Sequence, residues 1–474
     1  MVDRNELIEK FVKAIQEGYA AVFAGAGLSR ASGYVDWKDL LKPLAKNINL
    51  DIQKETDLIA VAQYYRNERG NRAGINQTIM NEFTKDVKDN ENVRILARLP
   101  IKTYWTTNYD NLIEDELKRN NKRVEIKIDK DQLAITLPDR DAVLYKMHGD
   151  ASNPADAVLT KDDYECYDIK RPLFRTALQG DLISKTFLFI GFSFEDPNLD
   201  YILSRIHSLL NENEREHFCF FKQIEREDCD TEDEFSYLKV KQELREKDLR
   251  RYGIQAVFVD KYDEITNILR EIEKSILLKN VFVSGCAKEY KRGWTKEKSD
   301  KLTYNLAKSL IREDYKIISG FGMGIGSSVI NGALSEIYNS KYKHMDEHLS
   351  LRPFPQNIAD SIERENLYSK YRADMINDAG IVIFMFGNKE NPDGSISIAE
   401  GCMDEYELAK DKGKILIPIG STGYAAEKIL NEVKNDLVSY QYLSYYIDVL
   451  ENETDPDILV DTVLDIVRKI NISS

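Results

Sequence analysis

Short apolar runs that end in glycine or small polar residues recur along the whole chain, and this repeat constrains the fold more than any other feature. The first run, Ala20–Ala24, leads directly into Gly25-Ala26-Gly27-Leu28-Ser29. Charged segments with helical spacing separate the runs, and strands that alternate with helices predict a doubly wound parallel sheet. Further runs of this kind lie at residues 102–105, 142–147, 186–190 and 254–259.

The same alternation starts again after residue 280. Apolar runs at 281–283, 316–318, 381–386 and 415–419 each end in a glycine or a serine-glycine turn. A chain of 474 residues is long enough for two or three domains, since domains have roughly 100–200 residues. The sequence therefore predicts two α/β domains, residues 1–280 and 281–474. We expect a charged stretch at 225–251 to form a solvated pair of helices.

Composition excludes several classes of protein. The formal net charge is −15, from 66 Lys and Arg against 81 Asp and Glu, which argues against binding to a nucleic-acid backbone. No apolar run approaches the roughly 20 residues that a membrane span needs, and the N-terminus lacks a signal-peptide core, so we expect a cytoplasmic protein. The five cysteines form no C-x-x-C pair and the five histidines show no ligand spacing. The sequence predicts no metal site.

Polar residues with catalytic potential follow the strands of the first domain. Asn108 follows one strand, and its amide can hold a water or a ribose hydroxyl in place. His148 follows another, and an imidazole that titrates near neutrality is a natural general base. Taken singly, each residue is more often structural. The carboxyl ends of parallel strands meet at one edge of a sheet, however, so we expect these side chains to lie together.

Four short motifs in this domain resemble those of the sirtuin family, in the family's order. They are Gly25-Ala26-Gly27-Leu28-Ser29, Thr106-Thr107-Asn108-Tyr109-Asp110, His148-Gly149 and Gly191-Phe192-Ser193. The resemblance covers about residues 1–280 and implies a Rossmann-type domain that binds NAD and cleaves its nicotinamide–ribose bond. The NAD-binding residues that it implies are Gly25, Ala26, Gly27, Ser29, Asn108, Gly191 and Ser193.

Two departures from the sirtuin pattern bear on the reaction. The paired cysteines of the sirtuin zinc module are missing, with only Cys166 in that stretch, and Tyr34-Val35-Asp36-Trp37 replaces the family's P-D-F-R segment. Without an acyl-lysine, water becomes the nucleophile, and NAD is hydrolysed to ADP-ribose and nicotinamide. We expect a NAD+ glycohydrolase with NAD+ as substrate and no cofactor. The predicted catalytic residues are Asn108, which orients the water and ribose, His148 as base, and Asp110, which supports Asn108.

The second domain carries a glycine-rich turn after a strand. Gly320, Gly322, Gly324 and Gly326 alternate along one turn before a helix, which is hard to explain by packing and indicates a phosphate or nucleotide cradle. No G-K-[ST] follows, which excludes a P-loop. Arg372 and Lys389 can hold phosphates, and Glu405 can accept hydrogen bonds from ribose hydroxyls.

This half resembles SLOG domains, which are Rossmann-like α/β domains. The residues are Phe282-Val283-Ser284-Gly285, the segment 319–327 and the segment 351–356. A sirtuin-like domain followed by a SLOG domain resembles the effector family of the Thoeris anti-phage defence system. That resemblance implies a homotetramer activated by a cyclic ADP-ribose isomer, made by a TIR-domain partner. The implied signal-binding residues are Ser284, Gly285, Gly322, Gly324, Gly326, Arg372, Lys389 and Glu405.

Two alternatives remain open from the residues alone. A zinc-free sirtuin-like deacylase would consume NAD only when an acylated peptide is present. A non-catalytic nucleotide sensor would bind its ligand and release no nicotinamide.

Overall fold

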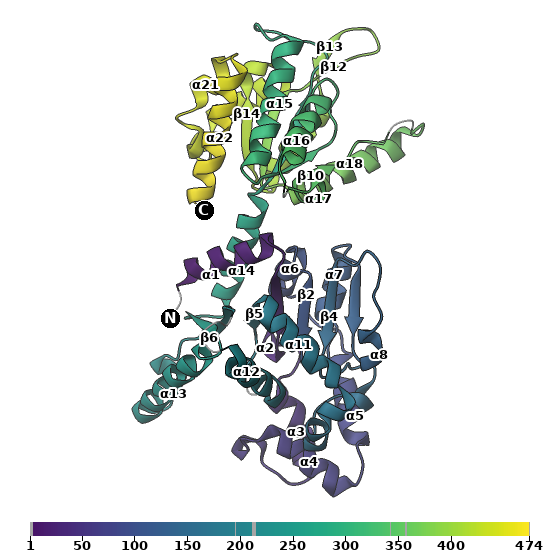
Figure 1. Cartoon of the computed structure of the whole chain (residues 1–474), viewed down its shortest axis with the longest axis vertical. Helices are drawn as coiled ribbons and strands as arrows, with labels where there is room; N and C mark the ends of the chain where they lie inside the picture. The colour runs from purple at the N-terminus through teal and green to yellow at the C-terminus, as the bar shows by residue number, and fades with distance from the viewer. Residues whose placement is uncertain (1–2, 195, 211–214, 342, 356–357, 474) are drawn as a thin grey trace. The chain divides into compact units, whose positions relative to one another are not determined.

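The computed structural model describes residues 3–194, 196–210, 215–341, 343–355 and 358–473. The chain divides into two compact units, Met1–Glu273 and Lys274–Ser474, here called the first and second unit (Figure 1). The division falls inside helix α14 (Asp263–Leu277), whereas the sequence analysis placed the boundary after this helix, at 280. Within the described ranges, no helix has both the length and the apolar character that crossing a membrane requires.

The first unit is built on a seven-stranded sheet in the order β3-β4-β2-β1-β5-β6-β7. Every pairing in it is parallel, which confirms the doubly wound α/β prediction. The sequence analysis gave no prediction for β3 or β6. The strands are β1 (Ala20–Ala24), β2 (Thr103–Thr106), β3 (Val124–Lys127), β4 (Ala142–Lys146), β5 (Thr186–Ile190), β6 (His217–Lys222) and β7 (Ile254–Val259).

Strand β1 is the point where the strand order reverses. In the sheet, β2, β4 and β3 lie on one side of β1, and β5, β6 and β7, which follow them in the chain, lie on the other. In sheets of this kind, ligands bind in the crevice at the carboxyl ends of the strands beside the reversal. The turns after β1, β2 and β5 lie at this crevice.

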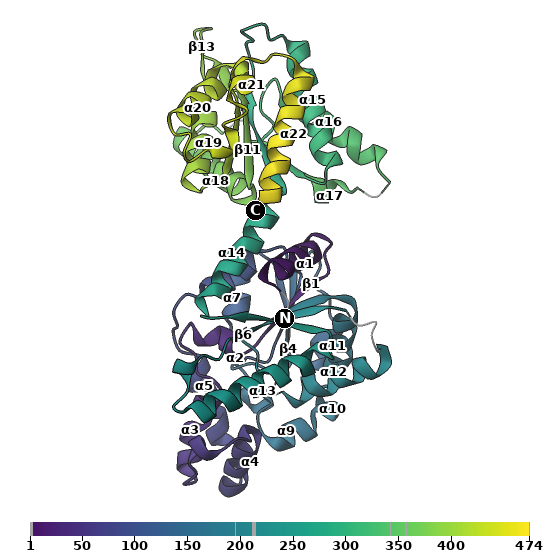
Figure 2. The ribbon, with the colours of Figure 1, turned by 90° about the vertical axis from the view of Figure 1, so that its left-hand side faces the viewer.

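Helices cover both faces of the sheet, with α7 on one side and α11 and α12 on the other (Figure 2). Leu178 of α11 and Ile202 of α12 belong to one buried cluster with Phe23 and Phe189 of the strands. The charged stretch at 225–251 is one helix, α13, after a short 3-10 turn, so the predicted helix pair is wrong. The helices are α1 (Arg4–Gln16), α2 (Ala26–Arg30), α3 (Trp37–Asn47), α4 (Leu58–Arg69), α5 (Ala73–Phe83), α6 (Glu91–Arg98), α7 (Leu112–Arg119), α8 (Lys130–Leu133), α9 (Lys161–Glu165), α10 (Tyr167–Lys170), α11 (Pro172–Ser184), α12 (Pro197–Leu210) and α13 (Glu232–Arg250).

The second unit has a parallel five-stranded sheet in the order β10-β9-β8-β11-β14 and a two-stranded hairpin. The strands are β8 (Asn280–Cys286), β9 (Lys316–Ser319), β10 (Leu349–Leu351), β11 (Ile381–Phe386) and β14 (Ile415–Ile419), with β12 (Asn388–Glu390) and β13 (Ile396–Ile398) in the hairpin.

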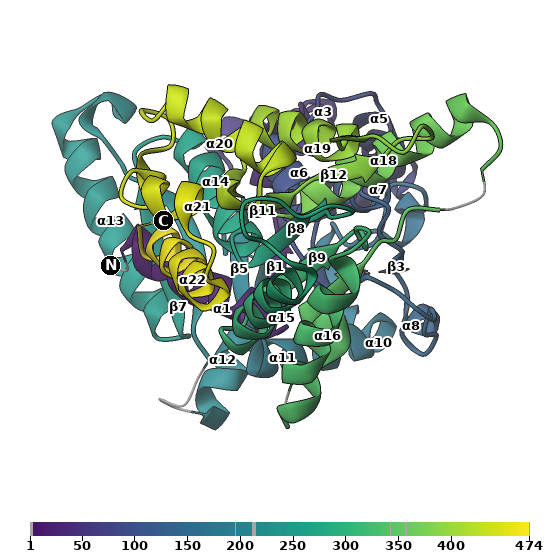
Figure 3. The ribbon, with the colours of Figure 1, turned by 90° about the horizontal axis from the view of Figure 1, so that it is seen from above.

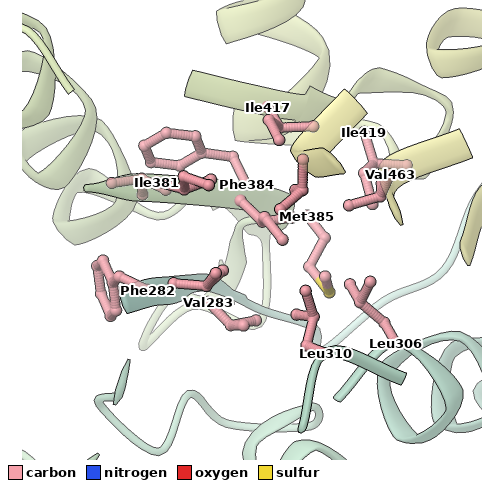
Figure 4. Packing of buried hydrophobic residues seen from close by; sticks show 14 of the residues in the cluster. Phe282, Val283, Leu306, Leu310, Ile381, Phe384, Met385, Ile417, Ile419 and Val463 are labelled. Carbon is pink, nitrogen blue, oxygen red and sulfur yellow. The ribbon is translucent and has the colours of Figure 1, made fainter. Parts of the chain in front are cut away.

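Helices α18, α19 and α20 lie on one face of this sheet, and α15, α16 and α22 on the other (Figure 3). Side chains of β8, β11 and β14 pack with Leu306 and Leu310 of α15 and with Val463 of α22 (Figure 4). The helices are α15 (Lys296–Arg312), α16 (Gly326–Asn339), α17 (Met345–His348), α18 (Ser361–Asp378), α19 (Glu400–Asp411), α20 (Tyr424–Asn435), α21 (Ile447–Asn452) and α22 (Pro456–Ser473).

Candidate functional site

Two glycine turns pack directly against each other at the reversal in the first unit. The amide of Gly27 donates to the carbonyl oxygen of Gly191 over 2.8 Å. A Cβ on Gly27 would lie 2.9 Å from the Cα of Gly191, and a Cβ on Gly191 would overlap the amide of Leu28. Backbone contact between the turns after β1 and β5 therefore requires glycine at both positions.

Asn108 is fixed at this point by both of its amide hydrogens. Its Nδ2 donates to the carbonyl oxygen of Gly25 over 3.0 Å and to Oγ of Ser29 over 2.9 Å. Ser29 in turn donates to Oδ2 of Asp110 over 2.7 Å, so Asp110 is linked to Asn108 through Ser29. Burial raises the pKa of Asp110, although the hydrogen bond from Ser29 opposes that shift. Since both hydrogens are engaged, Oδ1 is the atom of Asn108 that can accept a hydrogen bond from a ligand.

A narrow pocket opens beside these residues. Its walls come from helix α2, from the residues before α3, from α3 and α5, and from the turn after β2. It combines aromatic and aliphatic side chains with polar atoms. The pocket is lined by Ala26, Ser29, Val35, Asp36, Trp37, Leu40, Phe83, Thr107, Asn108, Tyr109 and Asp110.

His148 lies at the end of the neighbouring strand but does not line this pocket. Asn108 and His148 each stand two residues beyond a paired position, Thr106 on β2 and Lys146 on β4. The His148 side chain is fully buried, with its ring edge-on to Tyr164 and the ring centroids 5.6 Å apart. A ribose can reach the imidazole only after neighbouring side chains move.

The structure adds two charged residues that the sequence analysis missed. Asp196, in the turn after β5, places Oδ2 3.2 Å from Nε2 of His148. Lys146 is fully buried and donates to Glu114 over 2.8 Å, to Asp150, and to the backbone carbonyl of Asp110 over 2.7 Å. Burial alone would lower the pKa of Lys146, but Glu114 and Asp150 outweigh it and raise this pKa, so the ammonium stays charged.

Lys146 thereby holds the turn after β2 and the turn after β4 in one arrangement. No local sequence pattern identifies a buried lysine that joins two turns, because a lysine at a strand end is usually interpreted as a surface charge. Asp196 carried a weak signal, since it follows Gly191-Phe192-Ser193 closely in the chain. Within that motif, Ser193 is exposed, and its backbone carbonyl accepts a hydrogen bond from Arg245.

In the second unit, packing explains the glycines at 322, 324 and 326, which the sequence analysis found hard to explain in this way. A Cβ on Gly322 would overlap the carbonyl oxygen of Gly285, and one on Gly324 would overlap that of Ala287. A Cβ on Gly326 would lie 2.8 Å from the backbone of Phe321. The glycine turn after β9 thus packs on the end of β8, in the same way as the paired turns of the first unit.

Three of the predicted signal-binding side chains lie close together, on β8, α18 and α19. Ser284 donates to Oε2 of Glu405 over 2.6 Å, and Nε of Arg372 lies 4.0 Å from Oε1 of Glu405. Burial raises the pKa of Glu405 to about 7, against the opposing effects of Ser284 and Arg372. Lys389 lies on the hairpin and pairs with Glu400 over 3.1 Å. In the 351–356 segment, Gln356 lies outside the described residues.

Fold and site together define a SIR2-like domain followed by a SLOG domain. The model of the SIR2-like domain matches residues 102–255, and that of the Sir2- and TIR-associating SLOG family matches residues 264–470. The chain is 49% identical to the NAD(+) hydrolase ThsA of Bacillus cereus (strain MSX-D12), over 91% of this chain and 90% of that protein. It is 45% identical to the NAD(+) hydrolase ThsA of Acinetobacter baumannii (strain 532279), over 92% of each. The chain belongs to the ThsA family of NAD(+) hydrolases.

Proposed function

We propose that the first unit hydrolyses NAD+ to ADP-ribose and nicotinamide. The observation that carries this proposal is the network of Asn108, Ser29 and Asp110 at the reversal of the sheet, which leaves Oδ1 as the atom of Asn108 that can accept a hydrogen bond from a ligand. The pocket beside it combines polar atoms with aromatic walls, and we assign it to the nicotinamide end of the substrate. The names of the relatives support the same reaction.

The chemistry needs little from a general acid. Nicotinamide leaves with the electron pair of the glycosidic bond, which neutralises its cationic nitrogen. The oxygen of a water forms the new bond to C1′ of the ribose, and its proton passes to a base. Asn108 orients this water through Oδ1, and His148 acts as the base toward the water or a ribose hydroxyl. Asp110 keeps Asn108 in place through Ser29.

We further propose that the second unit binds a cyclic ADP-ribose isomer and that this ligand activates hydrolysis in a homotetramer. The cluster of Ser284, Glu405 and Arg372 offers both a ribose-binding carboxyl and a phosphate-binding guanidinium. A TIR-domain partner would supply the ligand, and depletion of NAD+ would serve anti-phage defence. A ligand activates only through its higher affinity for the active state.

The test is the release of nicotinamide from NAD+ by the purified chain, with and without a cyclic ADP-ribose isomer. We expect release with the isomer and little without it. Arg372→Ala should require roughly 10- to 100-fold more isomer for half-activation, because it removes a charge-assisted contact. Arg364→Ala, an exposed arginine on α18, is the matched control and should leave half-activation unchanged.

The alternatives give different results in the same assay. Release that requires an acylated peptide would support the deacylase and contradict hydrolysis by water. Tight binding of the isomer without release of nicotinamide under any condition would leave a sensor without catalysis.

A further inference from the structure

Asp196 is a buried carboxylate aimed at the ring of His148. Its Oδ2 lies 3.2 Å from Nε2 of His148 and accepts a hydrogen bond from the Tyr164 hydroxyl over 3.1 Å. Its Oδ1 accepts the backbone N–H groups of Asn198 over 2.9 Å and Leu199 over 3.1 Å, at the start of α12. Donors on both oxygens therefore fix the position and orientation of this carboxylate.

The carboxylate is charged in this setting. Burial acts to raise the pKa of Asp196, but His148 and the surrounding donors outweigh it and lower this pKa. An ionised carboxylate can only accept hydrogen bonds. The nitrogen of His148 that lies nearest to this carboxylate is Nε2, at 3.2 Å, so the negative charge favours a hydrogen on Nε2 over a lone pair there.

The two ring nitrogens of His148 differ in their charged neighbours. Both are buried and neither makes a hydrogen bond of good geometry among the described residues, but Nε2 has the Asp196 carboxylate 3.2 Å away. A buried nitrogen without a partner is costly unless a ligand or a proton engages it at some stage of function. With the hydrogen on Nε2, Nδ1 carries the lone pair that a general base needs.

We infer that Asp196 is a positioning residue that fixes the tautomer of His148, with the hydrogen on Nε2 and the basic lone pair on Nδ1. The inference rests on the proposed NAD+ hydrolysis for its catalytic part. When water attacks C1′ and the bond to nicotinamide breaks, Nδ1 takes the proton, and Asp196 stabilises the imidazolium that forms. A histidine held in this way by a carboxylate is a recurrent device for keeping one nitrogen basic.

A purely structural role offers a competing explanation. The bonds from Asn198 and Leu199 show that Asp196 also caps the N-terminus of α12. Asparagine caps a helix about as well as aspartate. Asp196→Asn therefore keeps the cap and the side-chain size but replaces the anion facing His148 with an amide that can donate to Nε2.

The first test reads the tautomer and does not depend on activity. Nitrogen chemical shifts of ¹⁵N-labelled histidine distinguish a protonated from an unprotonated ring nitrogen, and loss of signals in His148→Ala assigns them among the five histidines. We expect hydrogen on Nε2 in the parent chain and a shift of hydrogen toward Nδ1 in Asp196→Asn. The same tautomer in both chains, or hydrogen on Nδ1 in the parent, would overturn the inference.

The second test reads catalysis by a double-mutant cycle. Asp196→Asn should lower kcat for nicotinamide release by roughly 10²- to 10⁴-fold, with KM little changed. In a His148→Ala background the same substitution should have no further effect, because Asp196 acts through His148. Asp200→Asn, an exposed aspartate on α12, is the control for charge and should keep the parent kcat.

The outcomes separate this inference from the proposed function. An equal loss of kcat from Asp196→Asn with and without His148 would show a structural role and overturn the positioning role. A parent chain that releases no nicotinamide would contradict the proposed function, while the tautomer measurement would still decide whether Asp196 sets the protonation of His148.

Discussion

Both units carry their candidate residues at the carboxyl ends of parallel strands, and in both a glycine turn packs on the end of a neighbouring strand. The candidate catalytic residues of the first unit are buried at the end of the sheet: Asn108 is 8% exposed, Asp110 4% and His148 0%. The glycine turn of the second unit instead presents Phe321, 52% exposed, and Met323, 73% exposed. Burial of the catalytic candidates in the first unit suits a reaction that needs fixed geometry. In the second unit, Ser284 (2% exposed) and Glu405 (6% exposed) are buried as well, and the exposed side chains belong to the glycine turn.

The largest effect that this comparison predicts is on catalysis. Asn108→Ala should lower kcat for nicotinamide release by roughly 10²- to 10⁴-fold, because the water loses its orienting acceptor. The fold should persist, as checked by an unchanged cooperative thermal transition. Asn67→Ala, an exposed asparagine on α4, is the control. Near-parental kcat in Asn108→Ala would place the reaction elsewhere.

Removal of the buried ammonium should destabilise the first unit strongly. Lys146→Met leaves Glu114 and Asp150 buried without their cation, and breaking a buried ion pair costs about 3–5 kcal/mol. Denaturant unfolding followed by probes in each unit should show the loss in the first unit alone. The exposed Lys118→Met on α7 should change stability by less than about 0.5 kcal/mol. Equal effects of the two substitutions would contradict the stabilising role of the buried contacts of Lys146 with Glu114 and Asp150.

Glu405 predicts a pH dependence that belongs to the second unit. Its folded-state pKa is raised from 4.5 to about 7, so its contribution to stability is complete below pH 4.5 and is lost as the pH rises through about 7. Glu405→Gln removes this titration. Between pH 4.5 and pH 8 the free energy of unfolding of the parent chain should therefore fall by up to about 3 kcal/mol more than that of Glu405→Gln. The exposed Glu407→Gln on the same helix should follow the parent curve. If the free energy of unfolding changes with pH in the same way in all three chains, the raised pKa of Glu405 is refuted.

The smallest predicted effect concerns the packed glycine turns. Gly191 and Gly70 have nearly the same left-handed φ, 64° and 66°, but only Gly191 has backbone in the space of a Cβ. Gly70→Ala should cost about 1 kcal/mol from backbone strain alone. Gly191→Ala should cost about 2 kcal/mol more through the added overlap, measured by the midpoint of denaturant unfolding. A similar loss of stability at both sites would show that the turns after β1 and β5 move apart at little cost in free energy.

Some strands were predicted with the bounds that the structure gives, at the edges of the sheets as well as in their centres. The bounds of β1, β5, β7, β11 and β14 match the predicted runs, because each of these strands is a continuous or nearly continuous apolar segment. Strand β3 was missed because Glu125 and Lys127 interrupt its apolar pattern at the edge of the sheet. The short strands of the hairpin, β12 and β13, contain too few residues for a periodic signal.

The sequence by itself determined the two parallel-sheet units, their order and the strand ends that carry Asn108, Asp110 and His148. These follow from local apolar runs and from motifs that are contiguous in the chain. Only the tertiary structure decided that Asp196 faces His148, that Lys146 joins the turns after β2 and β4, and that glycine turns pack on neighbouring strand ends. The physical reason is that these contacts join residues far apart in sequence, and strand order and register determine which of them meet.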